Sequence, residues 1–289
     1  MKRWRPIPLL RTVLIYTALL LITLTLTACG GGSATPATIS AQGSPPSSGP
    51  GTPVPTPTPT PVPTPTPKPG GPTVIDNIED STHWLTCGAC GNAGGTGGIA
   101  QYSVTPNLPS PSEDGSATQF SIAATIPFTN AYWYMPHPVV PNQFAMLNYE
   151  FDLLVPNGSE NLPQAIEFEC QQILGGWIYN FAFQADYGRD QWRVFDYGSK
   201  TWESAGLPLQ RFAPGMWHHI MAEYHNDTIN HTVFHDALTV DGIRYTINMT
   251  HNAFFTGSSD QFTNAFQLDS NSRTDPYSVY VDKMKISYE

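Results

Sequence analysis

The sequence predicts an all-β domain in which two antiparallel sheets pack as a sandwich. After residue 73, no long stretch carries the 3.6-residue periodicity of a helix. Short runs of aromatic and β-branched residues occur instead, separated by Gly, Pro, Asn and Asp, as in strands joined by turns. The pair Asp241-Gly242 lies between apolar residues and favours a two-residue hairpin turn. Many short strands with such turns are typical of a β-sandwich.

The expected strands number about eleven. Their ranges are 118–124, 131–134, 146–154, 165–173, 177–185, 191–196, 217–225, 231–240, 243–249, 264–269 and 278–288. Runs of this length are usual for strands and short for helices.

The chain begins with a segment that predicts export. Residues 1–28 have a short basic start and then an apolar run, which is long enough for a signal peptide and short for a membrane span. They end Leu26-Thr27-Ala28-Cys29, which resembles the lipobox of bacterial lipoproteins. The resemblance implies cleavage before Cys29 and a lipid on its sulfur. We therefore expect a protein that is anchored to a membrane of the bacterial cell envelope and exposed outside the cytoplasm. A plain signal peptide with an incidental cysteine and an uncleaved signal anchor are the alternatives.

Residues 29–72 predict a disordered stalk. Gly and Ser are frequent in its first part, and alternating Pro and Thr make up the second. Proline fixes φ and removes backbone donors, so the second part is expected to extend as polyproline II. The folded domain is therefore expected to cover 73–289.

The charge of this domain restricts its partners. All 23 Asp and Glu lie within 73–289, together with eight of the 13 Lys and Arg, so its formal charge is −15. Such a charge opposes binding to nucleic acid, which depends on neutralising phosphates, and it also opposes polyanionic glycans. We expect a neutral glycan as the partner and a monomeric protein.

Three cysteines remain besides the one in the lipobox. Cys87 and Cys90 form a C-x-x-C beside a glycine-rich run, without the second pair of a four-cysteine zinc site or the helix of a redox motif. A small disulfide between them is the interpretation we favour. Cys170 lies on the apolar side of an expected strand and is predicted to be a buried free thiol.

Two motifs resemble the concanavalin A-like lectin and glucanase superfamily. The run Gly215-Met216-Trp217-His218-His219-Ile220 is followed one strand later by Val240-Asp241-Gly242, as in the Gly-x-Trp-His and Val-Asp-Gly rhythm of that superfamily. The runs 74–80 and 279–286 are similar to the paired terminal strands of carbohydrate-binding jelly rolls. The resemblance implies a jelly roll of two curved sheets with a sugar groove on the concave one, although fold alone does not fix function.

The run 165–173, AIEFECQQI, alternates apolar and polar residues. Alternation places Glu167, Glu169 and Gln171 together on the face of the strand that is not core. Carboxylates and amides there suit hydrogen bonds to sugar hydroxyls. The resemblance to laminarinase-type glucanases implies that Glu167 stands at the nucleophile position, Glu169 at the helper position and Gln171 at the acid/base position. An amide cannot donate a proton as a general acid, so Gln171 departs from the mechanism of a retaining hydrolase.

Aromatic rings near this strand in the sequence suit stacking on pyranose rings. The residues expected to contact the glycan are Glu167, Glu169, Gln171, Trp177, Tyr179, Trp192, Arg193, Gln267 and Asp269. Burial in the core is the alternative for the rings, and a salt bridge to one of the two glutamates is the alternative for Arg193.

The resemblance to carbohydrate-binding jelly rolls also implies a structural calcium ion that ties the terminal strands together. Glu79, Asp80 and Asp282 are the candidate ligands, because Ca²⁺ prefers oxygen donors. Simple exposure of these acids to solvent is the alternative. No other cofactor is expected.

Taken together, the sequence predicts a lipid-anchored extracytoplasmic module that binds a neutral polysaccharide. One alternative is a glycoside hydrolase or polysaccharide lyase that uses Glu167 and Glu169. Another is a structural or adhesive surface module. A carboxylate pair with a proton donor opposite favours the enzyme, and aromatic rings without such a pair favour binding.

Overall fold

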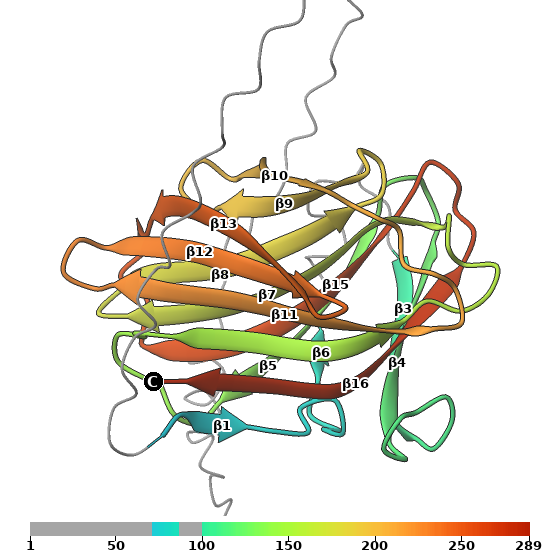
Figure 1. Cartoon of the computed structure of the whole chain (residues 1–289), viewed down its shortest axis with the longest axis horizontal. Helices are drawn as coiled ribbons and strands as arrows, with labels where there is room; N and C mark the ends of the chain where they lie inside the picture. Colours follow the sequence, from blue (N-terminus) through green and yellow to red (C-terminus); the bar gives the residue numbers. More distant parts are fainter. Residues whose placement is uncertain (1–70, 87–99) are drawn as a thin grey trace, which may run out of the picture.

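The structure is a computed structural model that describes residues 71–86 and 100–289. These residues form two antiparallel sheets that pack face to face (Figure 1). Within the described ranges, no helix has the length and apolar character needed to cross a membrane.

The first sheet has the strand order β13-β12-β11-β6-β16-β4-β3, and β1 pairs with β16. Its strands are β1 (Thr73–Ile75), β3 (Ala100–Leu108), β4 (Ala117–Ala124), β6 (Leu147–Leu154), β11 (Trp217–Asp227), β12 (Thr232–Val240), β13 (Ile243–Asn252) and β16 (Tyr277–Tyr288). The pairing of β1 with β16 joins the two ends of the described chain, as expected for the terminal strands.

The second sheet has the strand order β10-β9-β8-β7-β15-β5-β2, and β14 pairs with β8. Its strands are β2 (Leu85–Thr86), β5 (Asn130–His137), β7 (Pro163–Leu174), β8 (Trp177–Asp186), β9 (Gln191–Asp196), β10 (Thr201–Pro208), β14 (Phe254–Phe255) and β15 (Gln261–Ser270). The run AIEFECQQI lies in β7, between β8 and β15.

The predicted antiparallel jelly-roll sandwich is confirmed, and each of the expected strands is present. The two longest strands that the sequence did not reveal are β3 and β10, which both lie at the edge of a sheet. Pro106 interrupts the pattern of β3, and Gly206 interrupts that of β10. Edge strands tolerate such residues because one side of their backbone has no partner strand.

The hairpin between β12 and β13 has the predicted turn. Val240 pairs with Ile243 across it. Asp241 and Gly242 have φ angles of 51° and 78°, and positive φ at both central residues is the conformation that the Asp-Gly pair favours.

The core between the sheets is rich in aromatic rings. Phe151 of β6 meets Phe168 of β7 and Phe266 of β15 with ring centroids 5.0 and 6.0 Å apart. Rings packed edge to face contribute both buried apolar area and favourable electrostatics. Cys170 is fully buried beside them and free, as predicted.

Gln172 ties β7 to the opposite sheet. Its side chain is fully buried, and its Nε2 donates to the carbonyls of Pro141 and Asn142. Its Oε1 accepts a hydrogen bond of 2.8 Å from Asn226 Nδ2, and Asn226 Oδ1 in turn accepts one from the Phe144 amide. One buried amide therefore satisfies backbone groups of the segment that precedes β6.

This arrangement predicts that adjacent glutamines differ sharply in their contribution to stability. Gln172→Ala leaves buried partners without a hydrogen bond and should lower the free energy of unfolding by about 2–3 kcal/mol. Gln171→Ala, on the outward side, should change it by less than about 0.5 kcal/mol. Urea denaturation measures both, and equal effects would contradict the assignment of faces on β7.

Candidate functional site

Strand β7 presents polar side chains on the outer side of the second sheet. Phe168 and Cys170 are buried in the core, whereas Glu167, Glu169 and Gln171 are half-buried on the other side. The alternation predicted from the sequence is therefore correct. Outward side chains of the neighbouring strands extend this surface, which we call the polar face and which comprises Glu167, Glu169, Gln171, Asn180, Gln184, Gln267 and Asp269.

Glu167 lies between two amides on the adjacent strands. Gln184 of β8 and Gln267 of β15 are its direct partners in the strand register. Gln184 Nε2 donates to Glu167 Oε1 at 2.5 Å, and Gln267 Nε2 donates to Oε2 at 2.7 Å. The carboxylate is thus held by neutral donors on both sides.

Glu169, two residues further along β7, has a similar environment. Tyr132 Oη donates to Glu169 Oε1 at 2.6 Å, and Asn180 Nδ2 donates to Oε2 at 2.9 Å. Burial raises the pKa of Glu169, and the hydrogen bonds from Asn180 and Tyr132 oppose that rise. The donors fix the carboxylate in one orientation.

Asp269 adds a third carboxyl to the polar face. Gln267 Nε2 donates to its Oδ1 at 2.9 Å, so one amide bridges Asp269 and Glu167. Burial raises the pKa of Asp269 to about 7, and burial together with the neighbouring Asp269 raises the pKa of Glu167 well above its ordinary range. The two carboxyls therefore retain a proton between them near neutral pH, because two adjacent charges in a partly buried place repel.

An apolar group borders the polar face on the side of β9 and β10. This outer aromatic cluster consists of Ile173, Ile178, Ala182, Phe195 and Tyr197, with Trp202 packed against it. These residues form a second, smaller buried cluster in which Phe195 and Tyr197 are each 6% exposed, and only Trp202 is partly exposed. The ring centroids of Phe195 and Trp202 are 5.0 Å apart. Amides, carboxylates and aromatic rings therefore lie side by side on one surface.

Lys200, in the turn between β9 and β10, links the outer aromatic cluster to the polar face. Its Nζ lies 2.9 Å from the centroid of the Tyr197 ring and 5.1 Å from that of Phe254. Burial lowers the pKa of Lys200 to about 8, and Glu169 and Asp196 oppose that decrease electrostatically. The ammonium is thus held by aromatic faces close to the carboxylates.

Several of the predicted contact residues lie elsewhere. Trp192 is 2% exposed and Tyr179 is 1% exposed. Both are core residues, because they occupy positions of β9 and β8 whose side chains point toward the first sheet. Trp177 has the same parity and stacks on the His231 ring at the end of the sandwich, with a centroid distance of 3.8 Å. The prediction that these three rings belong to the polar face is wrong.

Arg193 lies on the outer side but does not pair with either glutamate of β7. Its Nη1 is 3.3 Å from Asp186 Oδ2, and its Nη2 donates to the carbonyl of Trp202. The alternative of a salt bridge to Glu167 or Glu169 is therefore wrong, and the ion pair with Asp186 and the hydrogen bond to Trp202 brace β9 against β8 and β10.

Four contributors to the site were not predicted from the sequence: Tyr132, Asn180, Gln184 and Lys200. The first three lie on strands that were predicted. The alternation of residues along those strands already indicated that their side chains point outward. Lys200 lies in a turn, and its position over Tyr197 follows from tertiary packing that no local pattern encodes.

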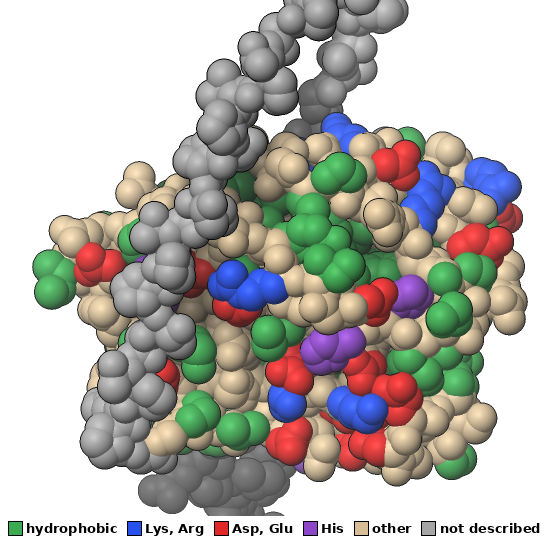
Figure 2. Space-filling model, in the orientation of Figure 1, with side chains coloured by type: hydrophobic (Ala, Val, Ile, Leu, Met, Phe, Trp, Pro, Cys, Tyr) green, Lys and Arg blue, Asp and Glu red, His purple; other side chains and the backbone are tan. Residues whose placement is uncertain are grey.

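The outer side of the first sheet has a different character. Its charges form ion pairs across strands: Lys285 with Glu150 at 2.6 Å, and Arg244 with Glu223 at 2.7 Å. Figure 2 shows acidic and basic side chains next to each other on this side. Paired surface charges of this kind are ordinary solvated features.

A second group of acids lies beside β16, and we call it the acid site. One carboxylate oxygen from each of Glu79, Asp114 and Asp282 lies within 4.8 Å of the others. Glu79 and Asp282 were predicted as ligands, and Asp114 was not. Asp80 does not belong to this group, and its Oδ1 accepts a hydrogen bond from Ser116.

The acid site has the features of a place for a hard cation. Glu79 is fully buried, its Oε2 accepts from the Met284 amide, and its Oε1 has no hydrogen-bond partner among the described residues. Burial raises the pKa of Glu79 to about 7. Asp282 is also fully buried. Clustered carboxylate oxygens suit Ca²⁺, so the residues present fit the ion that the sequence predicted.

Several predicted features lie outside the described residues. They are the lipidated Cys29 and the disulfide between Cys87 and Cys90. The signal peptide of residues 1–28 and most of the stalk of residues 29–72 lie outside as well.

Comparisons with known proteins find similarity in structure only. No family model matches the chain, and no curated protein matches it in sequence. Arcelin-5, a lectin-like defence protein from Phaseolus vulgaris, is 9% identical and covers 76% of this chain and 99% of its own, with a TM-score of 0.43. Peanut lectin is 11% identical and covers 75% and 96%, with a TM-score of 0.43.

A carbohydrate-binding module also appears among these neighbours. The family 11 module from Clostridium thermocellum, in complex with a β-1,3-1,4-mixed-linked tetrasaccharide, is 13% identical and covers 75% of this chain and 95% of its own, with a TM-score of 0.36. Similarity at this level carries no argument about what this chain binds.

The buried Glu79 predicts a pH-dependent stability. Its pKa is about 7 in the folded protein and about 4.5 when exposed, so the folded protein binds more protons between these values and loses stability as the pH rises through them. With a chelator present, Glu79→Gln should therefore raise the free energy of unfolding at pH 8 by about 2 kcal/mol, the order that such a shift implies. Below pH 4.5 the gain should disappear. Urea denaturation across this range measures it, and a gain that does not depend on pH would rule out the Glu79 carboxyl as its cause.

Proposed function

We propose that the polar face and the outer aromatic cluster bind a neutral glycan chain. We also propose that the domain is carried outside the cytoplasm on a lipid anchored at Cys29 and on the stalk of residues 29–72. The lipobox-like residues before Cys29 and the Pro-Thr composition of the stalk support the second part. The first part rests on the surface chemistry of the second sheet.

The observation that carries this proposal is the contrast between the two outer sides of the sandwich. On the first sheet, Glu150 and Glu223 pair with Lys285 and Arg244. On the second sheet, Glu167 and Glu169 accept hydrogen bonds from neutral amides and a phenol. Fixed carboxylates and amides provide acceptors and donors for hydroxyls, and the partly exposed Trp202 provides a ring for stacking.

The net charge of the domain favours an uncharged ligand. Glu167, Glu169 and Asp269 all lie on the polar face, and a uronate would bring a further negative charge to them. A neutral chain brings hydroxyl groups without that repulsion.

A panel of insoluble and soluble polysaccharides tests the proposal. We expect retention on a neutral glucan or mannan, and we expect Trp202→Ala or Glu169→Gln to weaken it by at least about tenfold, since tenfold corresponds to about 1.4 kcal/mol. Affinity electrophoresis measures the retention.

The matched control is Glu150→Gln on the first sheet, which removes a carboxylate from the opposite side of the sandwich. It should leave retention unchanged. Equal weakening by Glu150→Gln and Glu169→Gln, or no retention on any neutral polysaccharide, would reject the polar face as the binding surface.

Glycoside hydrolysis is the second candidate, and the pair of Glu167 and Asp269 favours it. Gln171 cannot act as the acid, but the retained proton on this pair places an acid on the same surface. The same panel distinguishes the candidates when released reducing ends are also measured. Product that disappears with Asp269→Asn would establish hydrolysis, and retention without product would establish binding alone.

We propose further that the acid site binds a structural Ca²⁺. The buried Glu79 and Asp282 and the exposed Asp114 would supply oxygen ligands, and the ion would compensate charges that are fully buried. Such an ion would fasten β16 to the segment between β1 and β2 and to the loop between β3 and β4, and it would have no part in glycan chemistry.

Calcium should therefore stabilise the folded protein. Adding Ca²⁺ in excess of its dissociation constant by about 100-fold should raise the free energy of unfolding by about 2.7 kcal/mol. Asp114→Asn, an exposed substitution, should reduce this gain, and Glu79→Gln should abolish it. Thermal unfolding with Ca²⁺ and with a chelator measures the effect, with Mg²⁺ as the control ion. An unchanged melting temperature would exclude calcium from the acid site.

A further inference from the structure

The edge of the sandwich where β9 leaves β8 contains a cleft that the proposed function does not use. Strand β8 pairs with β14 at Trp177 and Ile178 and with β9 only from Phe183 to Asp186. The hairpin of β9 and β10 therefore separates from the sheet and faces β13, the edge strand of the first sheet.

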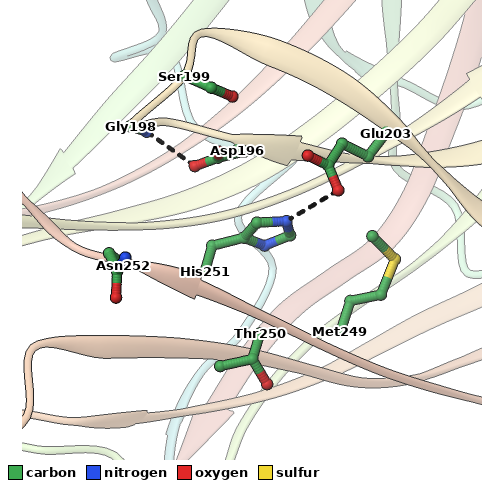
Figure 3. A pocket seen from close by; sticks show the side chains of 8 residues that line it. All are labelled: Asp196, Gly198, Ser199, Glu203, Met249, Thr250, His251 and Asn252. Carbon is green, nitrogen blue, oxygen red and sulfur yellow. Dashed lines mark hydrogen bonds and ion pairs between the residues drawn. The ribbon is translucent and has the colours of Figure 1, made fainter.

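This edge cleft has a volume of about 620 Å³, within the range of small-molecule sites. It is lined by Asp196, Gly198, Ser199, Glu203, Met249, Thr250, His251 and Asn252 (Figure 3). Four of these residues come from the hairpin of β9 and β10, and four come from β13.

The edge cleft is separate from the polar face. Glu203 lies opposite Val194 in the register of β9 and β10, and Asp196 has the same parity. Val194 is a core residue, so this side of the hairpin looks toward the first sheet, whereas the polar face looks away from it. A ligand in the edge cleft would not touch Glu167 or Glu169.

The charges of the edge cleft favour a cation. Asp196 and Glu203 are diagonal neighbours on one side of the hairpin, and none of the eight lining residues is Lys or Arg. Asp196 Oδ1 accepts a hydrogen bond from the Gly198 amide in its own turn. Two carboxylates in a lining that contains no Lys or Arg repel an anion and attract a positive charge placed between them.

A buried imidazole forms the inner wall of the edge cleft. The side chain of His251 is only 9% exposed, and its Nε2 lies 3.6 Å from Glu203 Oε2. Its Nδ1 is buried and has no hydrogen-bond partner among the described residues. Figure 3 shows this ring projecting from β13 toward Glu203, across the cleft.

A second imidazole lies behind the first. His235 is fully buried, and its ring centroid is 5.4 Å from that of His251. His235 Nε2 accepts from the Ala182 amide, so its Nδ1 carries the proton. That Nδ1 also has no partner among the described residues. Buried polar atoms of this kind cost free energy unless a polar group meets them.

We propose that the edge cleft binds a protonated amino sugar, with the ammonium between Asp196 and Glu203 and a hydroxyl group directed to His251. The carboxylates supply the charge, and the hydroxyl and amide groups of Ser199, Thr250 and Asn252 supply further hydrogen bonds. A hydroxylated ring with one positive charge is the small ligand that matches both halves of this lining.

Three sugars that differ at one position test the proposal on the full chain: D-glucosamine, D-glucose and N-acetyl-D-glucosamine, at a pH where the amine is protonated. The imidazole resonances of His251 and His235 in nitrogen-correlated NMR spectra report on the cleft directly. We expect D-glucosamine to shift them and the two uncharged sugars to bind at least about tenfold more weakly, as loss of a charge-assisted contact implies.

Two variants locate the site. Glu203 is half-exposed, so Glu203→Gln should fold normally, and it should weaken glucosamine binding by at least about tenfold. Glu167→Gln, on the polar face, should leave glucosamine binding unchanged. The amino-sugar proposal can therefore fail without the glycan proposal failing, and the reverse also holds. Equal binding of glucose and glucosamine, loss of binding with Glu167→Gln alone, or no shift with glucosamine would overturn the proposal.

Discussion

Partial burial of two carboxylates on strand β7 is the constraint on which the outer side of the second sheet depends. A carboxylate loses hydration when it is placed between strands, and the loss must be offset by hydrogen bonds. Glu167 and Glu169 have partners from β5, β8 and β15, so the side chains of four strands are fixed relative to one another. These hydrogen bonds hold the side chains of the polar face in one arrangement. Such preorganisation lowers the entropy that a binding surface loses.

The two outer sides of the sandwich divide the charges of the domain between them. On the first sheet, Glu150 and Glu223 are neutralised by ion pairs with Lys285 and Arg244. The second sheet concentrates acids among amides and rings, and the pKa values of Glu167 and Asp269 rise as a result. Glu167 and Asp269 lie on the side of the sandwich where recognition is proposed.

The hairpin of β9 and β10 serves two surfaces because its residues alternate. One side carries Phe195 and Trp202 toward the outer aromatic cluster, and the other carries Asp196 and Glu203 toward β13. Lys200 at its turn lies against the ring of Tyr197 and near Glu169. A displacement of this hairpin would therefore change the border of the polar face and the width of the edge cleft together.

The sequence by itself determined most of the strands, the faces of β7 and the turn at Asp241 and Gly242, because a period of two and positive φ are local properties. Alternation along β8 and β9 already separated inward from outward rings, yet nearness in sequence to β7 favoured Trp192, which the core buries. Only the tertiary structure brought Asp114 to Glu79 and Lys200 to Phe254, since those contacts join segments far apart in the chain. Strand order decides such neighbours, and no local pattern specifies it.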